Sequence, residues 1–148
     1  MTSDVASSVI DRPATEVFDF MADAGKLDLW SFGTWRIKLL EEGLVHGRTL
    51  HNGSSVYVRV LPHPEQQLID YQVGNTVESM TSRIFARITD GREFGADSNS
   101  CLLMIISLRT TTMDDARWQA LKDTHAVEVG LIKSLIECGY DHRREPYD

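Results

Sequence analysis

MDDARWQALKDTHAVEVGLIKSLIEC, residues 113–138, has the spacing of one long amphipathic helix. Its large apolar side chains fall on one side of a helical wheel: Trp118, Leu121, Val129, Ile132, Leu135 and Ile136. Asp114 and Asp115 suit the positive end of the helix dipole. Thr112 is the expected N-cap, and Gly139 is the expected left-handed residue after the last turn. Such a helix is about 39 Å long, so it must lie across a wide apolar surface.

Most of the chain before this helix is predicted to form β-strands, because apolar and polar residues alternate along it. The expected strands cover residues 4–10, 35–39, 44–51, 55–61, 67–73, 80–89 and 101–108, with short helices over 13–22 and 26–30. Asn52-Gly53 predicts a hairpin turn, and Pro62 and Pro64 are expected to end the strand over 55–61. Short turns between consecutive strands predict an antiparallel meander, whose apolar face only the terminal helix is long enough to cover.

The composition excludes several classes of function. The 148 residues are expected to form one domain, and a net charge of −7 argues against nucleic acid or an anionic membrane as a partner. No signal peptide and no membrane span are recognised, so a cytoplasmic location is expected. Cys101 and Cys138 lack metal-ligand spacing and are expected to be free thiols. Nucleotide, dinucleotide and serine-hydrolase motifs are absent, and no cofactor is expected.

The start of the chain carries a family resemblance. SSVIDRPATEVFDF, residues 7–20, resembles the opening strand, proline and helix of the START-like helix-grip superfamily, also called SRPBCC. Residues 26–30, which end in Trp30, and residues 58–62, which end in Pro62, resemble two later segments of that family. The family includes birch-pollen-type allergens, lipid-transfer domains, and polyketide cyclases and dehydratases. The resemblance implies a single START-like α+β domain over residues 1–148. In it, a curved antiparallel sheet of about seven strands wraps a long C-terminal helix, two short helices follow strand 1, and a cavity takes a hydrophobic small molecule.

His125 and Glu128 are the candidate catalytic residues. They are three positions apart and share the apolar face of the predicted helix, so both are expected to project toward the sheet. A desolvated glutamate beside a histidine can act as an acid and base pair. The alternative interpretation is a hydrogen-bonded core histidine and a glutamate whose carboxylate reaches water. No third ligand lies at metal spacing, so no metal site is expected.

The residues expected to bind the ligand lie on the inward faces of the strands and of the long helix: Trp35, Val58, Tyr71, Ile84, Trp118, Leu121, His125 and Ile132. The alternative for each aromatic residue is ordinary core packing. Arg59, Arg83 and Arg87 alternate with apolar residues and are interpreted as a solvated outer face of the sheet.

Three hypotheses of function follow. The first is binding, with or without transport, of a hydrophobic small molecule between sheet and helix. The second is a cofactor-independent cyclase or dehydratase that uses His125 and Glu128. The third is an interaction module without a ligand, in which Phe20, Trp35 and Trp118 fill the interior. Exposed strands make a homodimer possible, and the sequence leaves the oligomeric state open.

Overall fold

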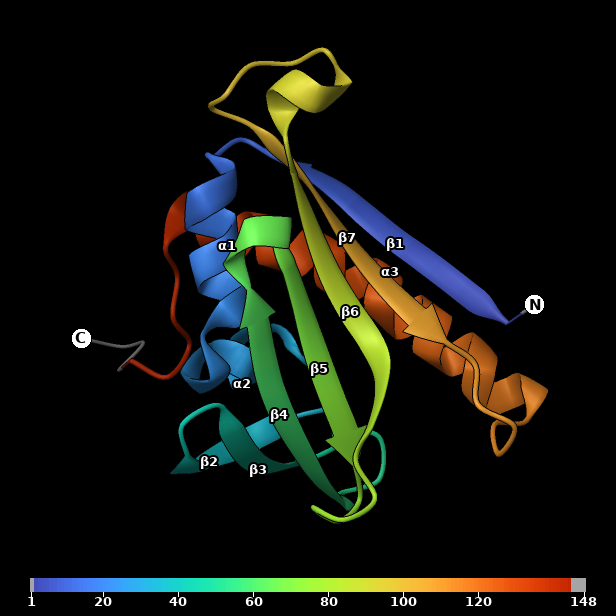
Figure 1. The fold of residues 1–148 in the computed structure, drawn as a ribbon. Coiled ribbons are helices and arrows are strands. Elements are labelled where there is room, and N and C mark those ends of the chain that lie inside the picture. The colour runs from blue at the N-terminus through green and yellow to red at the C-terminus, as the bar shows by residue number, and fades with distance from the viewer. Residues whose placement is uncertain (1, 145–148) are drawn as a thin grey trace.

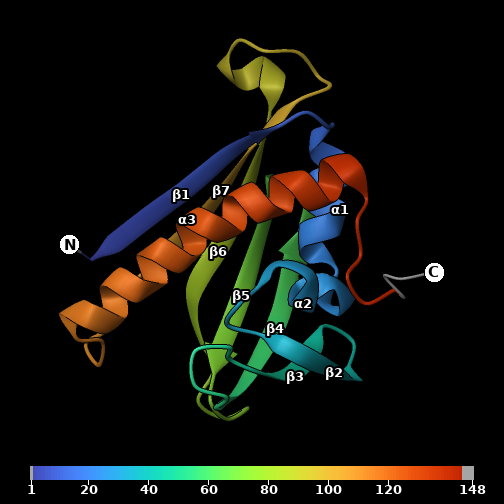
Figure 2. The same ribbon diagram turned by 180° about the vertical axis from the view of Figure 1, so that it is seen from behind.

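The fold is a curved antiparallel sheet laid around one long helix (Figures 1 and 2). A computed structural model describes residues 2–144. The strands are β1 (Ser3–Ile10), β2 (Trp35–Glu41), β3 (Leu44–Arg48), β4 (Ser55–His63), β5 (Leu68–Gly74), β6 (Thr81–Asp90) and β7 (Cys101–Leu108). The helices are α1 (Ala14–Ala22), α2 (Leu27–Trp30) and α3 (Asp115–Cys138), and three short 3-10 turns are η1 (Ala24–Lys26), η2 (Pro64–Gln66) and η3 (Gly91–Phe94).

The seven strands follow the order β1-β7-β6-β5-β4-β3-β2, and every neighbouring pair is antiparallel. Strands β2 to β7 are therefore a meander, and β1 joins its far edge beside β7. This arrangement confirms the predicted α+β helix-grip architecture, including the two short helices after the first strand.

Helix α3 crosses the concave face of the sheet diagonally (Figure 2). It packs mainly against β1 and less against β7 and α2. Ile132 is fully buried there, in one core with alternate residues of the strands, such as Ile69, Ile88 and Leu103. The alternation confirms that one sheet face is apolar and covered.

Both ends of α3 have clear caps. The N-cap is Asp114, whose carboxylate accepts a hydrogen bond from the backbone N–H of Arg117 at 2.7 Å. The prediction of Thr112 was wrong, because Asp114 offers a carboxylate two residues later and Thr112 Oγ1 pairs with Thr110 Oγ1 instead. Gly139 has φ +71°, which confirms the predicted left-handed end.

Several strand boundaries differ from the prediction by one to three residues, and the ends of β3 and β4 have a clear physical cause. Strand β3 ends at Arg48, because residues 49–54 form the turn around Asn52-Gly53. Strand β4 continues through Pro62, which lies opposite Ile69 of β5. The prolines were expected to end this strand earlier. The β3 ladder ends opposite Arg59, so beyond that point β4 pairs along one side only and the missing N–H of Pro62 is tolerated.

Candidate functional site

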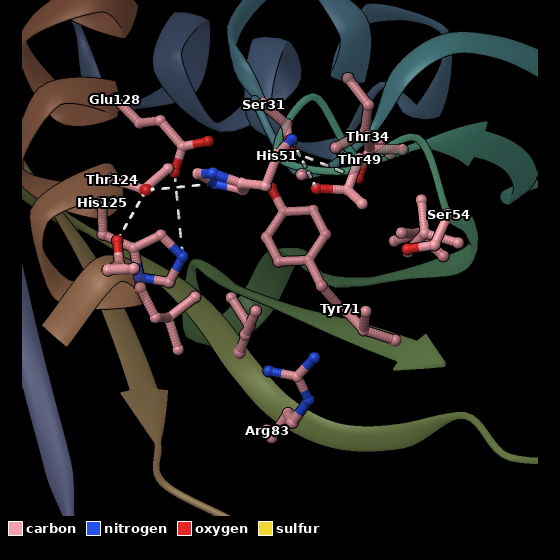
Figure 3. Close-up of a pocket in the computed structure, with 18 of the residues that line it drawn as sticks. Ser31, Thr34, Thr49, His51, Ser54, Tyr71, Arg83, Thr124, His125 and Glu128 are labelled. Carbon is pink, nitrogen blue, oxygen red and sulfur yellow. Dashed lines mark hydrogen bonds and ion pairs between the residues drawn. The ribbon is translucent and has the colours of Figure 1, made fainter. Parts of the chain in front are cut away.

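A pocket of about 570 Å³ lies where the first half of α3 stands away from β4, β5 and β6 (Figure 3). Its buried end contains Leu27 and Trp30 of α2, Tyr71 of β5, and Glu128. Its exposed rim contains four residues: His51 and Asn52 of the β3–β4 turn, Asn75 directly after β5, and Arg117 of α3. The pocket therefore runs from an exposed rim to a buried end.

Helix α3 contributes one stripe to the pocket wall. Arg117, Leu121, Thr124 and Glu128 follow each other at spacings of three or four residues, so they share one face of the helix. His125 lies at the edge of this stripe and also lines the pocket. At the rim, Thr124 Oγ1 lies 3.5 Å from His51 Nε2, which joins α3 to the β3–β4 turn (Figure 3).

The His125–Glu128 pair is buried at this wall. The two side chains are 6% and 3% exposed, and His125 Nε2 lies 3.8 Å from Glu128 Oε1. This separation is too long for a hydrogen bond. The other carboxyl oxygen, Oε2, accepts a hydrogen bond from the backbone N–H of Phe32 at 2.9 Å, and His125 Nδ1 has no partner within the described part of the chain.

Burial moves the two pKa values in opposite directions. It raises the pKa of Glu128 from 4.5 to about 8, although the hydrogen bond from Phe32 acts in the other direction. It lowers the pKa of His125 from 6.5 to about 4, and the guanidinium of Arg83 lowers it further. Near pH 7 both groups are therefore mainly neutral, so the contact is a protonated carboxyl beside a neutral imidazole rather than an ion pair.

Tyr71 closes the buried end. Its hydroxyl donates a hydrogen bond of 2.6 Å to the backbone oxygen of Met21, and its ring meets Trp30 edge-on with centroids 6.1 Å apart. Burial, and then the nearby Glu128, raise the pKa of Tyr71 well above its ordinary range. Tyr71 therefore stays a neutral wall residue whose hydroxyl proton is already engaged.

Arg83 turns into the pocket because of a β-bulge. The register between β5 and β6 pairs Tyr71 with Ile84 and Gln72 with Ser82, which leaves Arg83 as the extra residue. A bulge places two successive side chains on the same face, so Arg83 joins Ile84 on the inner side. Figure 3 shows its guanidinium directed toward the space between Tyr71 and His125. The prediction that Arg83 belongs to the outer face was therefore wrong.

The other two arginines lie as expected. Arg59 Nη1 lies 3.2 Å from Glu41 Oε1, and Arg87 is exposed. Both stay outside the lining of this pocket. They flank the inward residues of their strands, as the alternation predicts.

Five of the residues expected to bind a ligand line the pocket: Val58, Tyr71, Ile84, Leu121 and His125. Trp35, Trp118 and Ile132 are not among its lining residues. Trp35 stacks on His142, with centroids 4.8 Å apart, while Trp118 and Ile132 are buried on the neighbouring stripe of α3. That any of these residues contacts a ligand stays a prediction.

The pocket residues that the sequence did not indicate include Arg83, Arg117 and Trp30. Strand alternation assigns Arg83 to the wrong face, and Arg117 lies beside the apolar stripe of the helical wheel. Trp30 ends the segment that resembles the family pattern, and this was the only signal for it.

Two kinds of feature are absent from the described residues. No cluster of three or more histidine, cysteine, aspartate or glutamate side chains with the geometry of a metal site occurs in residues 2–144. No helix in the same range is both long and apolar enough to span a membrane. Cys101 is buried and Cys138 exposed, and both are free.

Solved structures share this fold at low sequence identity. The Zhui aromatase/cyclase of a Streptomyces species aligns with a TM-score of 0.67 and 18% identity, covering 96% of this chain and 97% of that one. The di-domain aromatase/cyclase BexL aligns with a TM-score of 0.69 and 16% identity, covering 93% of this chain and 47% of that one. Aha1 of Colwellia psychrerythraea, whose solution structure is a dimer, gives 0.67 and 15% identity, with 95% and 100% covered.

These likenesses support the helix-grip fold that the strand order and the long helix define. The sequence matches no protein-family model, and it matches no curated protein. At these identities the likeness concerns the fold alone, so the function has to be argued from the pocket.

Proposed function

We propose that this protein binds a small, largely apolar molecule in the pocket between α3 and the sheet. The observation that carries the proposal is the pocket itself. Its volume of about 570 Å³ is in the range of small-molecule sites, and apolar walls surround a few fixed polar groups. An interaction module with a filled interior is disfavoured. Its interior would hold at most a few water molecules, each of which takes about 30 Å³, whereas the pocket volume is about 570 Å³.

Direct binding of a neutral apolar dye tests the proposal. N-phenylnaphthylamine fluoresces when it leaves water, and we expect it to bind the purified protein in a one-to-one ratio. Leu121→Trp adds bulk to the pocket wall and is expected to weaken binding by roughly tenfold or more. Val127→Trp adds the same side chain at a position of α3 that is 60% exposed and should leave the affinity unchanged.

A wild-type protein that gives no saturable fluorescence with this dye would count against a binding function. Equal affinities for the Leu121→Trp and Val127→Trp proteins would mean that the dye binds elsewhere. Carriage of the molecule between sites, a cytoplasmic location and a homodimer remain predictions from the sequence.

A second candidate is a cyclase or dehydratase, and the buried His125–Glu128 pair favours it. A neutral imidazole can take a proton from a carbon next to a carbonyl, while a protonated carboxyl gives its proton to the carbonyl oxygen. The resulting enol can attack a second carbonyl and close a ring. Proteins of this fold named aromatase/cyclases add support at the level of the fold.

Turnover of a polyketide mimic tests this candidate. If the pair is catalytic, His125→Ala and Glu128→Gln are each expected to lower the rate by about a hundredfold. Glu137→Gln is the matched control, because Glu137 lies on the same helix and faces Lys133 and the backbone of Asp11. A rate that survives both changes removes the pair from the mechanism.

A further inference from the structure

The pocket has a charge balance opposite to that of the protein. The chain carries a net charge of −7. The described residues that line the pocket include two arginines, Arg83 and Arg117, and one carboxyl group, Glu128. The arginines in the pocket therefore cannot be explained by the overall charge of the protein.

Arg83 lacks a carboxylate partner among the described residues. Several other arginines have one: Arg59 pairs with Glu41, Arg92 with Asp90, Arg109 with Asp115, and Arg143 with Asp28 and Asp141. Of the arginines without one, Arg87 is exposed to water, whereas Arg83 is not. Arg83 is half-buried, and the bulge directs it into the pocket rather than to water. Partial burial, and then the nearby Arg117, lower its pKa. A desolvated cation without a counter-charge is unfavourable, so an anion beside Arg83 would be stabilised.

Glu128 does not supply that counter-charge. Its carboxyl is the only one along the pocket within the described chain, and burial keeps it mainly protonated near pH 7. His125 is mainly neutral under the same conditions. A negatively charged group entering the pocket would therefore meet two guanidinium groups and no ionised carboxylate.

We propose that the ligand is an amphiphilic anion whose oxyanion head group binds Arg83 and Arg117 while its apolar body packs against Trp30, Val58 and Leu121. A guanidinium can donate two parallel hydrogen bonds to a carboxylate or to a phosphate, and both share this chemistry. This inference rests on the proposed binding function and narrows its ligand class.

Two dyes that differ by one charged group test the inference. Anilinonaphthalenesulfonate and N-phenylnaphthylamine share an aromatic skeleton, and only the first carries an anionic group. Wild-type protein is expected to bind the anionic dye roughly tenfold more tightly, the usual effect of a charged hydrogen bond. Arg83→Gln should abolish most of this preference, so that its affinities for the two dyes become similar.

Two further variants control the test. Arg83→Lys keeps the positive charge without the planar fork, so it should retain part of the preference. Arg87→Gln removes an exposed arginine of the same strand that lies outside the pocket, and it should retain all of it. A single cooperative urea transition in every variant shows that each one has folded.

Equal affinities of the wild-type protein for the two dyes would overturn the inference, as would an unchanged preference in Arg83→Gln. Failure of both dyes to bind would instead contradict the binding function itself. Dodecanoate and dodecyl phosphate are expected to displace the anionic dye at roughly tenfold lower concentrations than dodecanol does. The stronger of the two anions identifies the head group. Competition by dodecanol as strong as that by the two anions would overturn the inference.

Discussion

Replacing Ile132 with alanine is expected to lower the free energy of unfolding by about 2–5 kcal/mol, measured by urea denaturation. Ile132 is fully buried where α3 packs against the sheet, and the close packing there leaves little freedom for the core to collapse around a lost side chain. Removal of three carbon atoms therefore has two costs. The burial of those atoms is lost, and the residues around the remaining cavity lose their packing contacts.

Val127→Ala is the matched control for this change. Val127 is on the same helix and 60% exposed, so its truncation should alter the free energy of unfolding by less than about 0.5 kcal/mol. The Ile132→Ala protein should also keep the wild-type affinity for N-phenylnaphthylamine while folded, because Ile132 does not line the pocket. A loss below 1 kcal/mol would contradict the close packing around Ile132. A change in dye affinity would place the Ile132 side chain in the pocket.

Stability should fall as the pH rises from 6.5 to 8, because of Glu128. Its pKa is 4.5 in the unfolded chain and about 8 in the folded protein, so in this window the folded state holds a proton that the unfolded state has lost. Raising the pH removes this advantage. From the shift, the loss between pH 6.5 and 8 is about 1.5–2 kcal/mol.

His125 has the opposite sign. Its folded pKa of about 4 lies below the ordinary 6.5, so its contribution to stability is present above pH 6.5 and is lost as the pH falls toward 4. The two contributions oppose each other between pH 4.5 and 6.5. The groups that surround Glu128 are His125 on its own helix, Tyr71 of β5, and the N–H of Phe32, with Arg83 of β6 beside His125.

The difference in free energy of unfolding between wild type and Glu128→Gln isolates the contribution of the Glu128 carboxyl group. Urea denaturation at pH 6.5, 7.25 and 8 should show wild type losing stability relative to this variant, whose amide oxygen can still accept the hydrogen bond from Phe32. Glu137→Gln should follow the wild-type curve, because Glu137 is paired with Lys133 near the surface. Parallel curves for wild type and Glu128→Gln would mean that Glu128 is ionised in the folded protein at pH 6.5.

The sequence predicted the fold well because the fold depends on repeating patterns. Ile69 and Tyr71 alternate with polar residues on β5, and that alternation alone assigns their faces. The long apolar stripe of α3 and the Asn52-Gly53 turn are equally local signals. The order of strands then follows from short connections between neighbours.

The pocket was harder to predict because it depends on exceptions to those patterns. Arg83 faces inward only because β6 has one more residue than β5 at the bulge, and strand alternation carries no sign of it. On α3 the pocket stripe mixes Arg117, Leu121 and Thr124, whereas the core stripe beside it is apolar. The helical wheel therefore selected Trp118 and Ile132, which belong to the core.

The central claim is that α3 and the sheet leave room for a small molecule. The most direct measurement is a set of intermolecular nuclear Overhauser effects between bound N-phenylnaphthylamine and assigned methyl groups. We expect contacts from the dye to the methyl groups of Val58, Ile84 and Leu121, and none to those of Ile132. Contacts confined to exposed methyl groups such as those of Leu39 and Val127 would contradict the claim.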